Sequence, residues 1–227
     1  GDFEKAIEML RKKGAAKAAD RAERSTGQGA VFIKREGNKV AMVQLLCETD
    51  FVAKGDDFLT VAESLADKLL KGEIGPEDKD VPAVKDAVLR LGENILIGHM
   101  SLVEGENVGD YIHSNKKIGV LVSLKGGNME LAKDIAMHVA ATNPQVVSPE
   151  EISMDLVERE KNIWADQLKA EGKPAEIVEK IMMGKEKKFR EENALVKQMF
   201  VKDPDKSIED LLKQAGAEII NFVRFSI

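Results

Sequence analysis

The sequence is poor in cysteine and aromatic residues, and it contains no long apolar run. Its 227 residues include one cysteine, one tryptophan and one tyrosine. A single cysteine excludes an internal disulfide, and because Cys47 lies in an apolar stretch we expect a reducing compartment. A membrane-spanning helix needs about 20 consecutive apolar residues, which are missing here. We therefore expect a soluble, cytoplasmic protein.

Recognisable catalytic and metal-binding patterns are also missing. The histidines His99, His113 and His138 are far apart in the sequence, and no cysteine pair accompanies them, so we expect no metal site and no cofactor. Neither common Gly-rich phosphate loop occurs, and Cys47 in a buried strand would be a poor nucleophile. We interpret His138 and His99 as partly buried structural residues. The sequence thus favours a non-enzymatic interaction protein.

Charge of one sign does not dominate the chain. There are 34 Lys and Arg residues against 40 Asp and Glu residues, which gives a net charge of -6. Proteins that coat nucleic acid normally carry a basic excess. The basic clusters at 11–13 and 185–190 alternate with acids or stand alone, so solvated helix faces explain them. We expect no direct nucleic-acid binding.

Residues 44–54 form the stretch around which the rest of the chain is organised. The apolar run that ends at Cys47 is typical of a buried strand, and a helix is expected to begin near Val52. Thr49 and Asp50 at this junction are ordinary helix-capping residues. Phe51 either packs on the helix that it precedes, as a hydrophobic staple, or points outward. From the residues alone, the staple is the favoured alternative.

The remaining pattern is a repeated unit of hairpin, helices and strand. The first unit has strands at 30–35, 39–47 and 95–103 and helices at 58–69 and 84–91. The second has strands at 109–114, 118–124 and 219–227 and helices at 131–140 and 208–215. This order predicts an α+β fold of two related subdomains, each an antiparallel sheet with helices on one face. We place the first subdomain at 25–106 and the second at 107–147 and 200–227.

The second subdomain carries an insertion at 148–199. A helix is expected to start at Ser148 and Pro149, and Val157, Trp164 and Leu168 then lie along one stripe. The pattern predicts a projecting helical hairpin of coiled-coil type. Partner binding, self-association through this hairpin, and simple packing are alternatives that the residues leave open. Residues 1–24 read as one amphipathic helix followed by a helical linker.

Several motifs together resemble the elongation factor Ts family, in its bacterial or organellar form. TDFVAK at 49–54 resembles the family's signature, and LGENI at 91–95, IAMHVAA at 135–141 and GAEI at 216–219 follow in the family's order. The opening GDFEKAI at 1–7 resembles the end of the family's ubiquitin-associated-like N-terminal module. That module normally has three helices, and the family usually continues beyond the final strand. We therefore expect weaker partner affinity than a complete factor has.

The resemblance implies a guanine nucleotide exchange factor for elongation factor Tu, in a bacterial cytosol or an organelle matrix. Asp50 and Phe51 would enter the GTPase near its magnesium, with Phe51 as an outward wedge. The implied partner-binding residues are Thr49, Asp50, Phe51 and Val52, with further contacts from Leu91, Gly92, Tyr111 and His113. The alternative function is a helical-hairpin scaffold or a ribosome- or RNA-associated factor without exchange activity.

Overall fold

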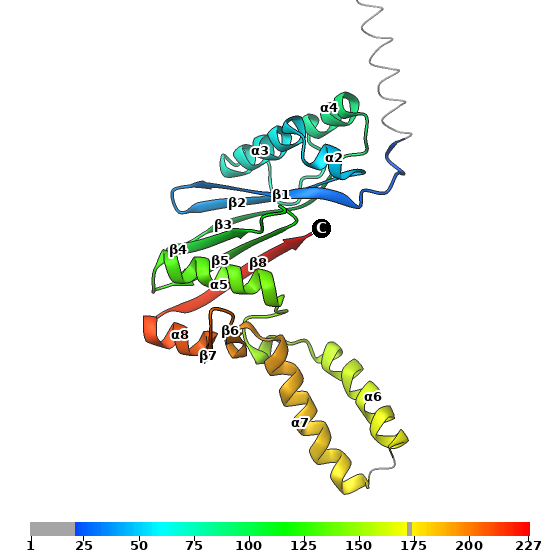
Figure 1. Cartoon of the computed structure of the whole chain (residues 1–227), viewed down its shortest axis with the longest axis vertical. Coiled ribbons are helices and arrows are strands. Elements are labelled where there is room, and N and C mark those ends of the chain that lie inside the picture. The colour runs from blue at the N-terminus through cyan, green and yellow to red at the C-terminus, as the bar shows by residue number, and fades with distance from the viewer. Residues whose placement is uncertain (1–20, 172–173) are drawn as a thin grey trace, which may run out of the picture.

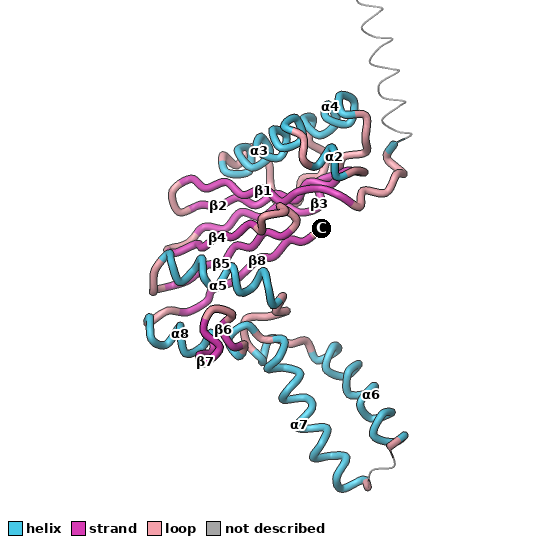
Figure 2. The backbone as a smooth tube through the Cα atoms, in the orientation of Figure 1, coloured by secondary structure: helices cyan, strands magenta, loops and turns pink. Residues whose placement is uncertain are grey.

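A computed structural model describes residues 21–171 and 174–227. The helix expected near 3–10 and most of the linker lie outside the described residues. The chain has the predicted α+β class, with two three-stranded antiparallel sheets and one small two-stranded sheet in the described ranges. Figures 1 and 2 show these sheets stacked in the body of the molecule, with a helical arm extending from one end.

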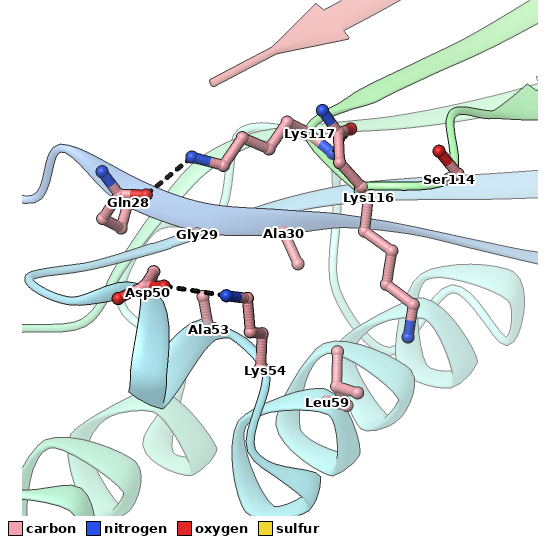
Figure 3. A pocket seen from close by; sticks show the side chains of 11 residues that line it. Gln28, Gly29, Ala30, Asp50, Ala53, Lys54, Leu59, Ser114, Lys116 and Lys117 are labelled. Atoms are coloured by element: carbon pink, nitrogen blue, oxygen red, sulfur yellow. Dashed lines mark hydrogen bonds and ion pairs between the residues drawn. The ribbon is translucent and has the colours of Figure 1, made fainter.

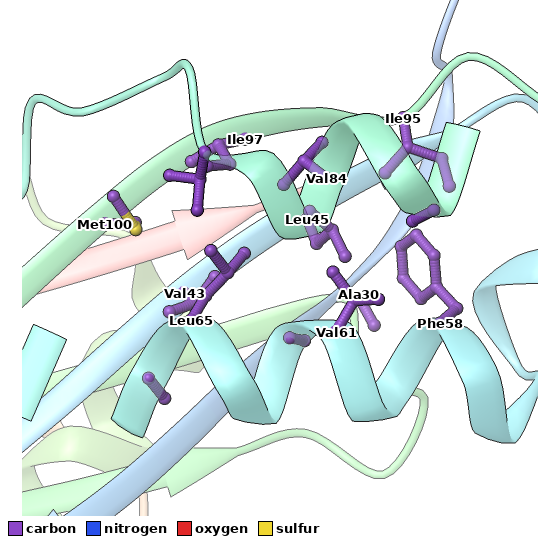
Figure 4. Packing of buried hydrophobic residues seen from close by; sticks show 14 of the residues in the cluster. Ala30, Val43, Leu45, Phe58, Val61, Leu65, Val84, Ile95, Ile97 and Met100 are labelled. Atoms are coloured by element: carbon purple, nitrogen blue, oxygen red, sulfur yellow. The ribbon is translucent and has the colours of Figure 1, made fainter. Parts of the chain in front are cut away.

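The first sheet has the strand order β1-β2-β3 and is completed across three intervening helices. Its hairpin turns at Gly37, which has the positive φ of 59° that glycine favours. In α3, apolar residues spaced three and four apart, from Phe58 to Leu69, pack on this sheet as predicted (Figure 4). The elements are β1 (Gln28–Glu36), β2 (Lys39–Cys47), α2 (Asp50–Ala53), α3 (Asp56–Leu70), α4 (Pro82–Leu91) and β3 (Leu96–Glu104).

The second sheet repeats this topology with the order β4-β5-β8. In each sheet, the edge strand that follows the helices has a bulge opposite a buried polar side chain of the central strand. The extra residue is Gly98 of β3, opposite Gln44 and Leu45, and Ile220 of β8, opposite Ser123 and Leu124. The matching position of the bulges supports the relation between the two units. The elements are β4 (Asn107–Ile112), β5 (Ile118–Lys125), α5 (Met129–Thr142), α8 (Ile208–Ala215) and β8 (Glu218–Ser226).

The two sheets pack against each other, and the sequence patterns did not predict this contact. Helices α3 and α4 cover the outer face of the first sheet, while α5 and α8 cover the outer face of the second (Figure 1). Between the sheets, Val31 and Met42 of the first meet Leu121 of the second. Gly119 lies at this contact, where a Cβ atom would collide with Val31. The body therefore has four layers, two of helices around two of strands.

The insertion forms a projecting hairpin of α6 (Met154–Ala170) and α7 (Ala175–Asn193), as Figure 1 shows. Trp164 is buried and meets the Phe189 ring edge-on at 5.7 Å between centroids. The expected helix start at Pro149 is wrong. That segment is a short 3-10 helix, η1 (Pro149–Glu151), and α6 begins after Ser153, whose hydroxyl accepts a 3.3 Å hydrogen bond from Leu156 N.

Three short elements lead from the hairpin back to the second sheet. They are η2 (Leu195–Lys197), β6 (Met199–Phe200) and β7 (Asp203–Ser207), and the β6–β7 ribbon was not predicted. Across the described ranges, the structure contains no helix whose length and apolarity would suit it to crossing a membrane.

Candidate functional site

The junction between β2 and α2 presents Phe51 to solvent. Thr49 is the N-cap of α2, and its hydroxyl accepts a hydrogen bond of 3.4 Å from Val52 N. Asp50 is the first residue inside the helix. The Phe51 side chain is 85% exposed, so the staple favoured by the residues alone is wrong and the outward orientation is correct. An exposed phenylalanine at the tip of a one-turn helix is available to a partner.

A carboxylate from another part of the chain holds this junction. Oε2 of Glu93 accepts hydrogen bonds from the backbone N–H groups of Glu48 at 3.0 Å and Thr49 at 3.1 Å. The Thr49 hydroxyl donates to Glu93 Oε1 at 2.6 Å. In return, the Glu48 carboxylate accepts a 2.7 Å hydrogen bond from Asn94 N. The loop before α2 is thereby tied to the connection between α4 and β3.

Leu91 and Gly92 end α4 directly before this carboxylate. Gly92 is the left-handed C-cap with φ 78°, and its N–H donates to Val88 O at 3.2 Å. Leu91 is half-buried against the first core. The structure thus brings the end of α4 beside the Thr49 loop. Sequence reasoning missed the role of Glu93, although Glu93 lies within the LGENI run noted for its resemblance.

Asp50 faces a cleft between α2 and the turn that joins β4 to β5. Its carboxylate accepts a 2.8 Å hydrogen bond from Lys54 Nζ, which holds the pKa of Asp50 below its usual value. The cleft has a volume of about 220 Å³ (Figure 3). Lys116 and Lys117 line its opposite side, and Lys117 Nζ donates to Gln28 Oε1 at 2.7 Å.

Tyr111 and His113 are neighbours of each other at the end of β4. The Tyr111 hydroxyl lies 3.2 Å from His113 Nδ1, and the ring centroids are 6.3 Å apart. The His113 backbone N–H donates to Ile118 O at 2.9 Å and closes the β4–β5 hairpin. It is the following turn, 114–117, that lines the cleft beside Asp50. Tyr111 and His113 therefore precede the turn that lines the cleft and do not line it themselves.

Of the two histidines interpreted as structural, only His138 fits that interpretation. His138 is fully buried, its Nε2 lies 3.0 Å from Gln198 Oε1, and burial lowers its pKa. His99 is exposed and packs against Phe225 at 5.5 Å between ring centroids. The prediction of a partly buried His99 is wrong because β3 is the edge strand of its sheet and turns this side chain away from the helices.

Cys47 is buried, as the apolar pattern predicted. Burial raises the pKa of its thiol to about 11, with a further contribution from the negative charge of Glu93. A thiol with so high a pKa is a poor nucleophile. Within 21–171 and 174–227, no group of three or more His, Cys, Asp or Glu side chains is arranged to hold a metal ion.

Comparison with known proteins identifies the family of the chain. A sequence model described as Elongation factor TS matches residues 48–227. The chain is 45% identical over 235 residues to Elongation factor Ts of Pseudomonas savastanoi pv. phaseolicola, with 100% of this chain and 81% of that protein covered. With the same coverage, it is 42% identical over 238 residues to Elongation factor Ts of Aeromonas hydrophila subsp. hydrophila. The chain therefore belongs to the elongation factor Ts family of translation elongation factors.

Proposed function

We propose that this chain binds elongation factor Tu in its GDP-bound form and promotes the release of GDP during translation elongation. The observation that carries the proposal is Phe51, a large apolar side chain that is 85% exposed on a one-turn helix held in place by Glu93. Leaving such a side chain in water is unfavourable, and a pocket on a partner would bury it. Family membership identifies the expected partner.

The proposed mechanism needs no covalent chemistry. A GTPase holds GDP largely through the phosphates and a magnesium ion that keeps near-octahedral coordination. If the chain binds better to a partner conformation in which that site is distorted, nucleotide affinity falls by the same coupling free energy. A coupling of about 4 kcal/mol would weaken GDP binding about a thousandfold. Phe51 would act as the wedge, and Asp50 would approach the magnesium.

The other proposed contacts surround the wedge. Thr49 and Val52 fix the shape of α2, and the end of α4 at Leu91 and Gly92 lies beside it. Tyr111 and His113 are proposed to face another domain of the partner. These residues lie on both subdomains, so the fixed packing of the two sheets would hold the contact regions in one arrangement.

We also propose that the insertion at 148–199 has a role separate from nucleotide exchange. The exchange site then belongs to the two subdomains, at 25–106 and at 107–147 with 200–227. The hairpin exposes Ile163, Ile177 and Met183 to solvent. Apolar side chains on a projecting arm are suited to self-association, which would add a second contact without covering Phe51. Sedimentation of the chain over a range of concentrations tests this, and a monomer at every concentration would contradict it.

The exchange proposal is tested by the release of a fluorescent GDP analogue from elongation factor Tu. We expect the chain to accelerate release, and Phe51→Ala to reduce the maximal stimulated rate at least about tenfold. The control is Met183→Ala, which also truncates an exposed apolar side chain on a helix but lies in the hairpin. With this control variant, elongation factor Tu should release the GDP analogue as fast as with the unmodified chain.

Two results would contradict the proposal. The first is an unmodified chain that binds elongation factor Tu without accelerating release. The second is a Phe51→Ala chain that is as active as the unmodified one. Tight binding to nucleic acid with a steep salt dependence would instead favour the RNA-associated alternative.

A further inference from the structure

We propose that Glu93 is the positioning residue that makes the wedge and the end of α4 one rigid unit. This inference rests on the proposed exchange function and adds a residue to it. Glu93 lies directly after Gly92 and accepts hydrogen bonds from the loop that carries Phe51. It would act through that loop, without contact to nucleotide or magnesium.

Helix α2 cannot hold its own shape. It has four residues, of which only Ala53 is buried, and Phe51 at its tip has almost no packing. A single helical turn is unfavourable by itself, because nucleation fixes several residues for one hydrogen bond. The direction in which Phe51 points is therefore set by bonds from outside the helix. The Glu93 carboxylate supplies the three bonds that tie down the two residues before α2.

The bonds of Glu93 continue into the cap of α2. The Thr49 hydroxyl has one hydrogen, which it donates to Glu93 Oε1 at 2.6 Å. Its lone pairs then accept from Val52 N at 3.4 Å, which caps the helix. Hydrogen bonds to an ionised acceptor are stronger than neutral ones. Without the carboxylate, two backbone N–H groups lose their partner and the hydroxyl is free to rotate away from the cap.

The other side of this link is fixed as well. The left-handed conformation of Gly92 sets the direction in which the chain leaves α4. Asn94 N donates to the Glu48 carboxylate at 2.7 Å, and the Asn94 side chain donates to Arg24 O at 2.8 Å. Glu93 is thus held between two anchored residues. Through its hydrogen bonds, the Glu93 carboxylate restrains the Thr49 loop in turn. Contact at the end of α4 and insertion of Phe51 would therefore occur together.

The test compares two substitutions with a matched control in the GDP-release assay. Glu93→Ala removes all three hydrogen bonds, and we expect the maximal stimulated rate to fall at least about tenfold. In Glu93→Gln the amide oxygen can still accept from both backbone N–H groups and the amide nitrogen can donate to the Thr49 hydroxyl, so activity should stay within about threefold. The control Glu104→Ala removes an exposed glutamate at the end of β3 and should leave release unchanged.

A double substitution separates positioning from general stability. If Glu93 acts through Phe51, then Phe51→Ala combined with Glu93→Ala should be no slower than Phe51→Ala alone. Losses that multiply would overturn the proposal, and so would a Glu93→Gln chain as slow as Glu93→Ala.

Hydrogen exchange of the free chain tests the link without the partner. Glu93→Ala should accelerate exchange at the Glu48 and Thr49 amides while the core amides of β2 keep their protection. Unchanged exchange at these two amides would overturn the role of Glu93 even if exchange activity is real. If Glu93→Ala accelerates exchange at these two amides but the unmodified chain does not accelerate GDP release, the exchange function is contradicted and the link through Glu93 is retained.

Discussion

Lys54 Nζ lies 2.8 Å from Oδ2 of Asp50, so the carboxylate next to the exposed Phe51 is paired within its own helix. The pair lowers the pKa of Asp50, first through the hydrogen bond and then through the charge of Lys54. Because the pKa of Asp50 is lowered in the folded chain, the pair stabilises the fold above the unfolded pKa of Asp50. This stabilisation is lost as the pH falls through the folded pKa.

Lys54→Met should raise the pKa of Asp50 back toward its ordinary value. Both side chains are substantially exposed, so the melting temperature should change little. Titration of the Asp50 carboxyl carbon by NMR measures the shift, with Lys71→Met as a control on a lysine outside this pair. An Asp50 pKa that does not move in Lys54→Met would show that the ion pair does not form in solution.

His138 should make the chain less stable in mild acid. Burial lowers its pKa below the usual 6.5, so below about pH 6.5 the unfolded chain binds a proton that the folded chain does not. The free energy of unfolding therefore falls as the pH decreases through this range. His138→Gln removes this proton uptake but also disturbs the contact with Gln198, so the variant should be less stable at pH 7.5.

Urea unfolding between pH 7.5 and 5.5 measures this effect. The difference in unfolding free energy between the unmodified chain and His138→Gln should narrow as the pH falls. If the difference in unfolding free energy between the two chains is the same at every pH, burial does not disfavour the charged imidazole.

Cys47 should resist thiol reagents until the chain unfolds. With its pKa raised to about 11, only about one thiol in a thousand is ionised at pH 8, and the side chain is buried. Labelling by a disulfide reagent should follow the urea unfolding curve measured by circular dichroism. Rapid labelling without urea would contradict the packing of β2 against the helices.

Trp164 is the only tryptophan, so its fluorescence reports on the hairpin alone. Phe189→Ala removes the ring packed against it, and because that ring is half-buried we expect a local loss of about 1–3 kcal/mol. The fluorescence transition in urea should move to lower concentration while the circular dichroism transition of the body stays in place. Met183→Ala should move neither, and a joint shift of both transitions would mean that the hairpin unfolds with the body.

The repeat of hairpin, helices and strand could be predicted because each unit carries its own local signals. Apolar spacing of three and four residues marked α3, and glycine at positions 92 and 216 ended the helices before β3 and β8, where both adopt positive φ. The packing of one sheet on the other could not be predicted in the same way. The apolar run of β2, which only Gln44 interrupts, indicates that both faces of the strand are buried. It does not indicate which element covers the second face.

The candidate site was predictable in part. The sequence marked the Thr49–Phe51 junction as a capped strand-to-helix turn, but an apolar residue before a helix fits a staple as well as an exposed contact. Only its 85% exposure separates the two. The link from Glu93 to Thr49 spans 44 residues, and no local pattern encodes a hydrogen bond over that distance. His99 was misjudged because its strand gives no sequence signal of being at a sheet edge.

The most direct measurement is the equilibrium affinity of elongation factor Tu for GDP with and without a saturating concentration of this chain. The chain should raise the dissociation constant of GDP, about a thousandfold for a coupling of about 4 kcal/mol, and Phe51→Ala should remove most of the increase. By linkage, GDP should weaken binding of the chain by the same factor. If the chain binds elongation factor Tu and the affinity for GDP stays the same, the chain does not act as an exchange factor.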